Sequence, residues 1–476
     1  MMKTQQMFQR REFFNWGVRG IGATAFTNLL IQDRARAATA SLLPHYTPKA
    51  KRAIHICLVG GLSHVDSFDP KPELTRNHGK AANLSEKPDI FFGKVGPLRG
   101  ADWEFKPRGR SGLLISEMFP HIASHADDLT VIRSMVSQSA NHTPALFFQN
   151  SGFEFNGYPS MGSWVAFGLG AESESLPAYV VLPDGRGSPN GGSSNWTNGF
   201  LPSQYQGVPF NGGDRPIQDI FPAKEISGAE EEASLNLLSR LNQKHQERTR
   251  LEDMLSARIR SYELAARMQL SVPEVTDVSD ESDATREMYG IGKNPTDDCG
   301  RRCLLGRRLL EKGVRFVQVF SGGPIAGSPR KSWDAHENVK QNHGAEAARI
   351  DKPVAALLAD LKQRGMLDET LVLFTSEFGR TPFAQSGRGT VGPGRDHNKG
   401  GFSIWAAGGG LRPGIAYGGT DEIGWRAAVD PVSWHDFHAT VLHLLGMNHE
   451  RLTFYHNGIE RRLTNVHGDP VQGILA

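Results

Sequence analysis

Cysteine is scarce in this sequence of 476 residues, which contains only Cys57, Cys299 and Cys303. Three cysteines are too few for a disulfide scaffold. Charge of one sign is also lacking, because 53 Lys and Arg balance 51 Asp and Glu. That balance argues against a dedicated nucleic-acid binder, which needs a basic field to hold the phosphate backbone. No apolar run approaches about 18 residues, so the sequence predicts no transmembrane segment.

The first 37 residues are predicted to be a twin-arginine signal peptide. A basic pair at 10–11 precedes a weakly apolar stretch at 20–31 and the small-residue site Ala35-Arg36-Ala37. This order is typical of exported proteins, although Gln9 and Phe14 depart from the pattern Ser/Thr-Arg-Arg-x-Phe-Leu. The sequence therefore predicts export by the twin-arginine machinery to the periplasm or the extracellular space. A basic amphipathic helix at a cytosolic N-terminus is the alternative.

Residues 38–476 are predicted to form one α/β domain. Short apolar runs predict strands at 53–59, 129–132, 178–182, 314–320, 370–375 and 401–407, and helical patterns lie at 301–312, 345–364 and 436–445. Such alternation indicates a three-layer sandwich, with a mainly parallel central sheet and helices on both faces. A Gly- and Ser-rich segment followed by amphipathic helices predicts a cap insertion at 185–290.

Polar side chains gather where the predicted strands meet their loops. They are His64 and Asp66 after the first strand, His142 and Thr143 after the second, Asp334 and His336 after 314–320, Glu377 after 370–375, and Asp396 and His397 before 401–407. In mainly parallel sheets, function collects at the carboxyl ends of the strands. Carboxylates and imidazoles are ligands for divalent ions such as Zn, Mn, Mg or Ca. The pattern therefore predicts a metal site at this edge.

Other polar groups are predicted to be structural. The C-terminal region is rich in histidine, at His435, His438, His443, His449 and His456, with His467 and Asp469 in a tail loop. Their places on and after an amphipathic helix favour packing over metal binding. Cys299 and Cys303 share a helix face without further ligands, which also favours packing. The arginine pairs at 301–302 and 307–308 are predicted to lie on a solvated helix face.

The order of the motifs resembles the alkaline phosphatase/sulfatase superfamily. Ser376-Glu377-Phe378-Gly379 stands where that superfamily has Ser-Asp-His-Gly, and Asp436–Gly446 resembles its closing helix. More specifically, Trp-Asp-x-His at 333–336, Glu-Phe-Gly-Arg-Thr-Pro at 377–382 and Gly-Arg-Asp-His at 394–397, after a twin-arginine leader, resemble the bacterial family described as domain of unknown function 1501. The resemblance covers essentially all of the mature chain and implies an alkaline-phosphatase-like fold.

The resemblance carries over to individual residues with gaps. It implies metal ligands at Asp334, His336, Glu377 and His397, and the polar pattern at the sheet edge adds His64, Asp66 and Asp396 to the predicted ligands. Gly61 stands where the superfamily usually has an Asp, and Phe378 replaces a ligand His. The expected nucleophile position, counted back from Gly152, falls on His142. The lack of a nearby cysteine excludes a cysteine-type sulfatase.

The resulting hypothesis is an exported hydrolase of phosphate or sulfate esters, acting on a polysaccharide or another envelope or extracellular substrate. One or two divalent ions would polarise the ester oxygens. His142 would be nucleophile, general base or metal ligand, with Thr143 beside it, and Arg380 or Arg395 would hold the anion. The alternative is a catalytically inactive member of the fold that binds anionic glycans or joins an envelope complex.

Overall fold

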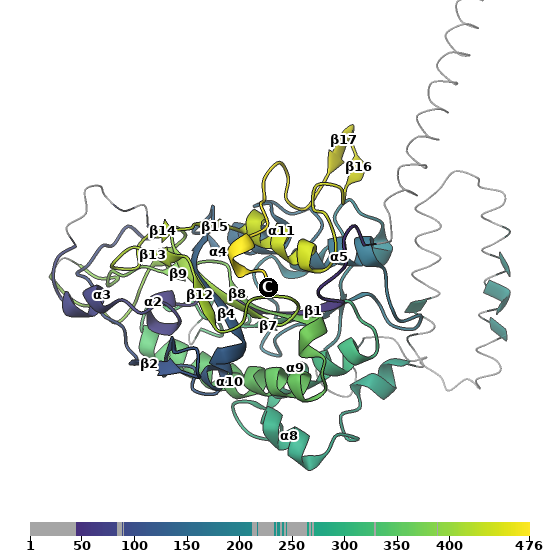
Figure 1. Ribbon diagram of the computed structural model, residues 1–476, viewed down its shortest axis with the longest axis horizontal. Helices are drawn as coiled ribbons and strands as arrows, with labels where there is room; N and C mark the ends of the chain where they lie inside the picture. Colours follow the sequence, from purple (N-terminus) through teal and green to yellow (C-terminus); the bar gives the residue numbers. More distant parts are fainter. Residues whose placement is uncertain are drawn as a thin grey trace, which may run out of the picture.

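The computed structural model describes residues 44–82, 88, 90–211 and 271–476, except 328, 329 and 388, with isolated positions between 217 and 268 (Figure 1). The predicted leader and most of the predicted helices at 230–270 lie outside the described residues. Among those that are described, no helix is long and apolar enough to cross a membrane. The helices and strands of the described residues run from Arg52 to Ile474.

A large central sheet organises the domain. Among the described residues it has nine strands: β1 (Arg52–Leu58), β4 (Leu129–Val136), β5 (Tyr179–Leu182), β6 (Val208–Pro209), β7 (Phe316–Ser321), β8 (Thr370–Ser376), β11 (Phe402–Ala407), β12 (Ile415–Tyr417) and β15 (Val432–Ser433). Their order is β12-β4-β11-β8-β1-β7-β5-β6, with β15 also on β4. All pairs are parallel except those of β11, which runs antiparallel to β4 and β8. The prediction of a mainly parallel sheet is confirmed.

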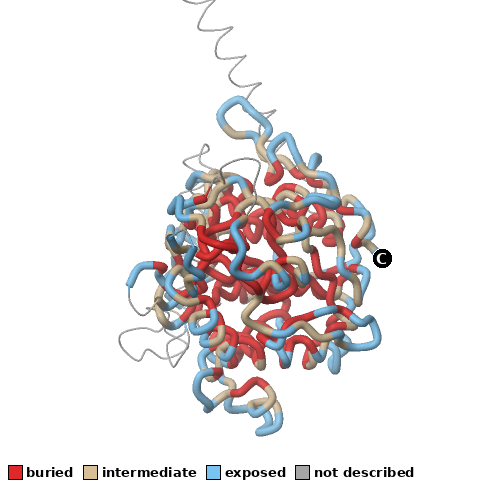
Figure 2. The backbone as a smooth tube through the Cα atoms, turned by 90° about the vertical axis from the view of Figure 1, so that its left-hand side faces the viewer, coloured by how far each residue is buried: buried red, intermediate tan, exposed pale blue. Residues whose placement is uncertain are grey.

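Helices cover both faces of this sheet (Figure 1). One layer contains α9 (Asp297–Glu311) and α10 (Val339–Gln363), and the other contains α4 (His142–Ser151), α5 (Met161–Leu169) and α11 (Trp434–Leu444). Alternate residues of β1 point into the two layers, because Ile54 and Ile56 join one apolar cluster while Ala53 and Cys57 join the other. The buried backbone runs through the middle of the domain in Figure 2. This is the predicted three-layer sandwich.

Shorter elements occupy the connections. The helices are α2 (His64–Ser67), α3 (Pro72–Arg76) and α8 (Asp283–Tyr289), with 3-10 turns at Ile122–Asp128, Gly192–Trp196, Ser203–Tyr205, Leu367–Glu369 and Gln472–Ile474. The strands are β2 (Phe105–Arg108), β3 (Leu113–Ser116), β9 (Gly379–Arg380), β10 (His397–Asn398), β13 (Gly419–Thr420), β14 (Ala427–Val429), β16 (Phe454–His456) and β17 (Ile459–Arg461). Part of the predicted cap segment packs into the domain, because Trp196 and Phe210 are buried.

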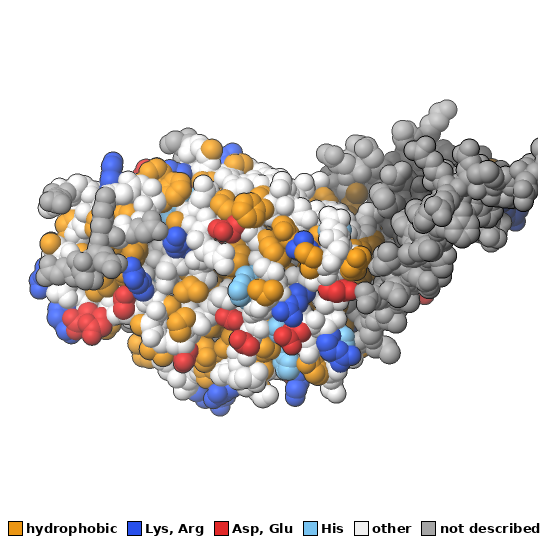
Figure 3. Space-filling model, turned by 90° about the horizontal axis from the view of Figure 1, so that it is seen from above, with side chains coloured by type: hydrophobic (Ala, Val, Ile, Leu, Met, Phe, Trp, Pro, Cys, Tyr) orange, Lys and Arg blue, Asp and Glu red, His pale blue; other side chains and the backbone are white. Residues whose placement is uncertain are grey.

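The surface carries charges of both signs. On the described part of the face drawn in Figure 3, acidic and basic side chains are interspersed. No field of one sign is visible there, which agrees with the balanced composition.

Helix α9 corrects one expectation from the sequence. Arg302 and Arg307 are each only 2% exposed, so the prediction of a wholly solvated arginine face was wrong. Arg302 pairs with Asp298 one turn earlier and donates to the carbonyl of Phe320, and Arg307 lies 2.9 Å from Asp360. Buried guanidinium groups are tolerated because they are paired.

Candidate metal centre

The carboxyl edge of the central sheet brings four polar side chains together. His142 begins α4 after β4, Asp334 and His336 follow β7, and His397 lies on β10 just before β11. A residue before a strand would normally lie at the opposite edge. Because β11 is antiparallel to its neighbours, its amino end meets their carboxyl ends, and His397 reaches the same place as the others.

The three histidines converge on one carboxylate oxygen of Asp334. Asp334 Oδ1 lies 2.8 Å from His336 Nε2 and 3.3 Å from the Nε2 atoms of both His142 and His397. The Nε2 atoms of His336 and His397 are 2.9 Å apart. One ligand atom from each residue lies within 4.8 Å of all the others. Ligands of a tetrahedral zinc ion stand about 3.3–3.5 Å from one another, so these spacings suit a single metal ion.

Each imidazole is oriented by an oxygen on its far side. The Nδ1 atoms lie 2.7 Å from Glu377 Oε1 for His142, 2.6 Å from Gln385 Oε1 for His336, and 2.6 Å from the carbonyl of Ala140 for His397. Since these oxygens only accept, each Nδ1 carries a proton, and a ring that has no second proton turns the lone pair of Nε2 towards Asp334. This is how metal-binding histidines are usually held.

The chemistry of this arrangement suits a cation. The Nε2 atom of His142 is buried and has no hydrogen-bond partner. Three nitrogen lone pairs that face a carboxylate repel one another unless a positive charge lies between them. The donor set of three imidazoles and one carboxylate therefore fits a divalent ion of borderline softness.

Burial and charge set the protonation of these groups. Burial opposes ionisation of Asp334, but the Arg380 guanidinium holds its pKa far below the usual range. Burial likewise lowers the pKa of His397 well below its usual value. For His142, burial is outweighed by the contacts with Asp334 and Glu377, which raise the pKa, so a metal ion would have to replace the proton on Nε2. The pKa values of the neighbouring imidazoles of His142 and His397 are therefore shifted in opposite directions.

Glu377 lies behind the cluster rather than in it. Its carboxylate accepts hydrogen bonds from the amides of Gly60 at 2.8 Å and Gly61 at 3.2 Å, in addition to the His142 contact. Gly60 has φ +120, and a Cβ there would lie 2.4 Å from the amide nitrogen of Asp334. The turn after β1 therefore has no room for a side chain at Gly60, and Glu377 ties this turn to His142.

Arg380 and Arg395 are fully buried and use their donors within the protein. Arg380 donates to Asp334 Oδ1 at 2.7 Å and to the carbonyls of Gly60 and Gly61. Arg395 donates to Asp66 Oδ2 at 2.9 Å and to three main-chain carbonyls. Neither guanidinium faces solvent, so neither is placed to clamp an anion. Asp66 is held by Arg395 away from the cluster.

The remaining predicted residues have other partners. His64 lies in α2 with Nε2 2.8 Å from the carbonyl of Gly424. Asp396 accepts hydrogen bonds from the amides of His397 and Phe92, both at 2.8 Å. Thr143 is partly exposed in the first turn of α4. Of the predicted ligands, the structure brings together Asp334, His336 and His397, with His142 as a fourth.

Several residues that contact the cluster were not predicted from the sequence. Arg330 forms an ion pair with Asp334 Oδ2 and another with Glu337 at 2.8 Å, and its side chain is 23% exposed. Its place four residues before Asp334 was an available signal. Gln385 orients His336, and Phe91 and Phe92 pack against the histidine rings. These last residues lie in loops without a recognisable pattern.

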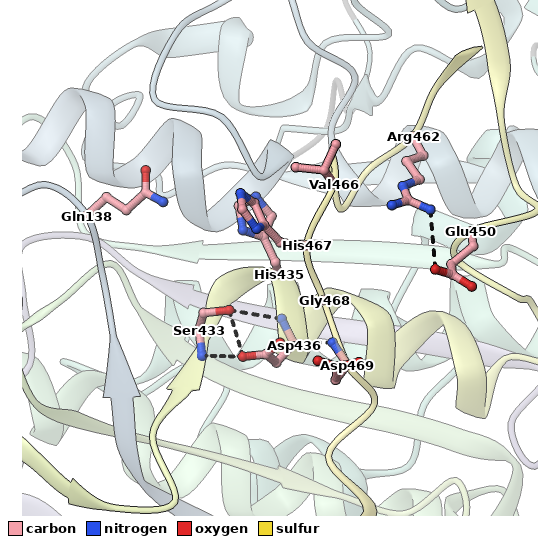
Figure 4. Close-up of a pocket in the computed structure, with 10 residues that line it drawn as sticks. All are labelled: Gln138, Ser433, His435, Asp436, Glu450, Arg462, Val466, His467, Gly468 and Asp469. Atoms are coloured by element: carbon pink, nitrogen blue, oxygen red, sulfur yellow. Dashed lines mark hydrogen bonds and ion pairs between the residues drawn. The ribbon is translucent and has the colours of Figure 1, made fainter.

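A cavity lies beside the histidine-rich C-terminal region. It has a volume of about 460 Å³ and its lining residues, drawn in Figure 4, do not include any of the four cluster residues. The rings of His435 and His467 lie close together there, with centroids 5.1 Å apart. His435 and His438 are buried and bond to the carbonyls of Gly152 and Gln149, as the packing interpretation expected.

The fold and the geometry define a mixed α/β protein with a candidate metal centre at the carboxyl edge of its sheet. The chain belongs to the family described as protein of unknown function DUF1501, which matches residues 50–475. This confirms the resemblance drawn from the motifs. No curated protein matches the chain by sequence.

Several solved structures are similar to this chain at low identity. A sulfatase from Pseudoalteromonas sp. has a TM-score of 0.34 and 14% identity, over 87% of this chain and 74% of its own. A phosphonate monoester hydrolase from Silicibacter pomeroyi has a TM-score of 0.31 and 12% identity, over 69% and 68%. An alkaline phosphatase superfamily protein from Vibrio parahaemolyticus has a TM-score of 0.32 and 10% identity, over 90% and 77%. At these scores the activity of this chain has to be argued from its own residues.

Proposed function

We propose that this protein is a metal-dependent hydrolase of phosphate or sulfate esters that acts outside the cytoplasm. The observation that carries the proposal is the convergence of three Nε2 atoms on Asp334, with every Nδ1 held by an oxygen. Such a fixed, buried set of donors is unfavourable without a cation and favourable with one. The predicted leader supports an extracytoplasmic location.

His142, Asp334, His336 and His397 would hold one ion. Three imidazoles favour Zn or Mn over Ca and Mg, which prefer sites made of oxygen. Asp66 and Glu377 have other partners, so the described residues provide one four-ligand site rather than two. Four protein ligands fill a tetrahedral shell, and catalysis therefore requires an ion that accepts a fifth or sixth ligand.

The charges around the cluster favour an anionic substrate. The positive charge of a divalent ion together with Arg330 and Arg380 would exceed the negative charge of the carboxylates of Asp334, Glu337 and Glu377. When bound, the ion supplies a Lewis acid that polarises the ester oxygens. Arg330, with its partly exposed side chain, replaces Arg380 and Arg395 as the guanidinium proposed to contact the anion.

Thr143 is the hydroxyl that we assign as nucleophile in this mechanism. It follows His142 directly and lies in the first turn of α4, where the positive end of the helix dipole favours a developing alkoxide. His142 itself is occupied as a ligand, with Nδ1 on Glu377 and Nε2 near Asp334. Its role here is to hold the ion rather than to attack the ester.

Metal content tests the proposal directly. Protein purified without chelator should contain about one Zn or Mn ion per chain by elemental analysis, and His336→Gln should lose it. His336 suits this test because its side chain lies at the cluster without a buried ionic partner other than Asp334. His467→Gln, in the cavity beside the C-terminal histidines, is the matched control and should keep the ion.

Activity is then measured on the loaded protein with 4-nitrophenyl phosphate and 4-nitrophenyl sulfate. Hydrolysis of either ester that disappears with His336→Gln would support the hydrolase. Wild-type protein without metal would overturn it.

The burial of the site and its four protein ligands favour a second function, in which the ion has a structural role. Asp334 and His397 are each 2% exposed, and four ligands complete a tetrahedral shell. In a catalytically inactive protein, a zinc ion here would stabilise the sheet edge while another surface binds an anionic glycan. Four-coordinate zinc by X-ray absorption, together with no hydrolysis of either ester, would select this function.

A further inference from the structure

Two half-exposed phenylalanines lie against the candidate metal centre. Phe91 and Phe92 are 47% and 53% exposed, and their ring centroids are 5.0 Å apart. Phe91 stacks on His397 at 5.0 Å, and Phe92 meets His336 edge-on at 4.7 Å. Each ring therefore contacts a ligand histidine on one side and water on the other. An apolar surface that remains exposed next to a polar site is typical of a ligand-binding surface.

One carboxylate fixes the aromatic pair relative to the centre. Asp396 Oδ2 accepts a hydrogen bond from the amide of Phe92 at 2.8 Å, and Oδ1 accepts one from the amide of His397 at 2.8 Å. Asp396 is itself buried. The pair is thus attached through a buried group to the same segment that carries a metal ligand, so its position is built into the site.

We propose that Phe91 and Phe92 form the subsite for the ring that carries the ester group of the substrate. This proposal rests on the proposed function, because it is the phosphate or sulfate at the centre that would bring the ring to this pair. The exposed ring surfaces can stack on the flat apolar face of an aromatic ring or of a sugar ring. A small alkyl ester has no such face and gains nothing from the pair.

Binding of non-hydrolysable anions to the metal-loaded protein tests the subsite. The probes are phenylphosphonate, a hexose 6-phosphonate and methylphosphonate, compared by isothermal titration calorimetry. At least one ring-bearing probe should bind about tenfold more tightly than methylphosphonate. The double variant Phe91→Ala/Phe92→Ala should remove that difference while it keeps the metal content and the unfolding midpoint of the wild type.

Two control variants separate ring stacking from general effects. Phe91→Tyr/Phe92→Tyr keeps both ring faces and should keep the preference. Phe155→Ala removes another exposed phenylalanine, 72% exposed and without a contact to His336 or His397, and should also leave the preference unchanged.

Each outcome either identifies the class of ring or contradicts the subsite or the proposed activity. A preference for phenylphosphonate alone identifies an aromatic substrate, and one for the hexose probe alone identifies a sugar. Equal binding of all three probes, failure of all three to bind, or a preference that survives the double alanine variant overturns the subsite. A ring preference without hydrolysis of any ester keeps the subsite and removes the proposed activity, whereas hydrolysis without a ring preference does the reverse.

Discussion

At the scale of single residues, the tautomers of three histidines determine what this centre can bind. Each Nδ1 has its own oxygen acceptor, from Glu377, Gln385 or the Ala140 carbonyl. The motifs in the sequence could not predict two of these partners. Gln385 lies in an irregular loop, and a main-chain carbonyl has no side-chain signature at all. Asp334, His336 and His397 could be predicted because carboxylate and imidazole lie close together in short motifs at strand ends.

Gln385→Leu should weaken metal binding. The variant removes the acceptor for His336 Nδ1, so the ring loses its preferred tautomer and orientation. Loss of such an outer partner typically lowers metal affinity about 10–100-fold. The affinity can be measured by competition with a coloured chelator. Gln472→Leu, in a surface turn near the C-terminus, is the control and should bind the ion as the wild type does. An unchanged affinity in Gln385→Leu would contradict the assigned tautomer.

Gly60→Ala should destabilise the fold strongly. The residue has φ +120, and the new Cβ would lie 2.4 Å from the Asp334 amide nitrogen. Strain and overlap together should lower the free energy of unfolding by about 3 kcal/mol or more.

Urea denaturation of Gly60→Ala beside Gly112→Ala separates these two effects. Gly112 also has positive φ, but a Cβ added there would meet nothing within 4 Å, so its variant should lose only about 1 kcal/mol. Similar losses for the two variants would show that the contact with Asp334 does not matter.

At the scale of secondary-structure elements, the apolar runs predicted the strands well but could not predict their directions. Runs such as 53–59 and 370–375 became β1 and β8 because both of their faces are buried. The run at 401–407 is buried in the same way, yet β11 is antiparallel. Hydrophobic periodicity reports burial and carries no information about direction. The prediction of a solvated arginine face on α9 was wrong for a related reason. The helical pattern carries no information about the partners of Arg307, Asp360 and Glu281, which lie outside α9.

Three buried histidines on separate elements should make the protein sensitive to acid. Burial lowers the pKa of His55 on β1, His343 on α10 and His438 on α11 to about 3 each. His343 Nε2 also accepts a hydrogen bond from the Ser63 amide at 3.0 Å, which requires the neutral ring. Their ordinary pKa is about 6.5 in the unfolded chain. Above that pH neither state is protonated and these histidines do not affect stability.

Below pH 6.5 the unfolded chain binds protons that the folded protein excludes. Each histidine should therefore lower the free energy of unfolding by about 1.4 kcal/mol per pH unit down to about pH 3. Urea denaturation at pH 7.0, 6.0 and 5.0 measures this slope. His343→Gln keeps an acceptor for Ser63 but cannot titrate, so its slope should be smaller by the share of one histidine. An equal slope in that variant would show that His343 does not exclude a proton.

At the scale of the whole molecule, binding of one ion should raise the stability of the domain. An ion that binds only the folded protein stabilises it by about 2.7 kcal/mol when its free concentration is about 100 times its Kd. Addition of a chelator should therefore lower the melting temperature of the wild type. The melting temperature of His336→Gln should not respond to the chelator, and that of the His467→Gln control should fall as in the wild type. A wild type that melts at the same temperature with and without chelator would mean that no ion is bound.

The candidate centre is assembled from segments that are widely separated along the chain. The carbonyl of Ala140, which orients His397, is 257 residues away from it in sequence, and Glu377 is 235 residues from His142. Bringing such distant segments together requires closure of very long loops, so no partial fold of the chain contains the site. Occupancy by an ion consequently acts as a signal of completed folding. A nascent chain should take up metal only after its last sheet strands, including β11, have paired.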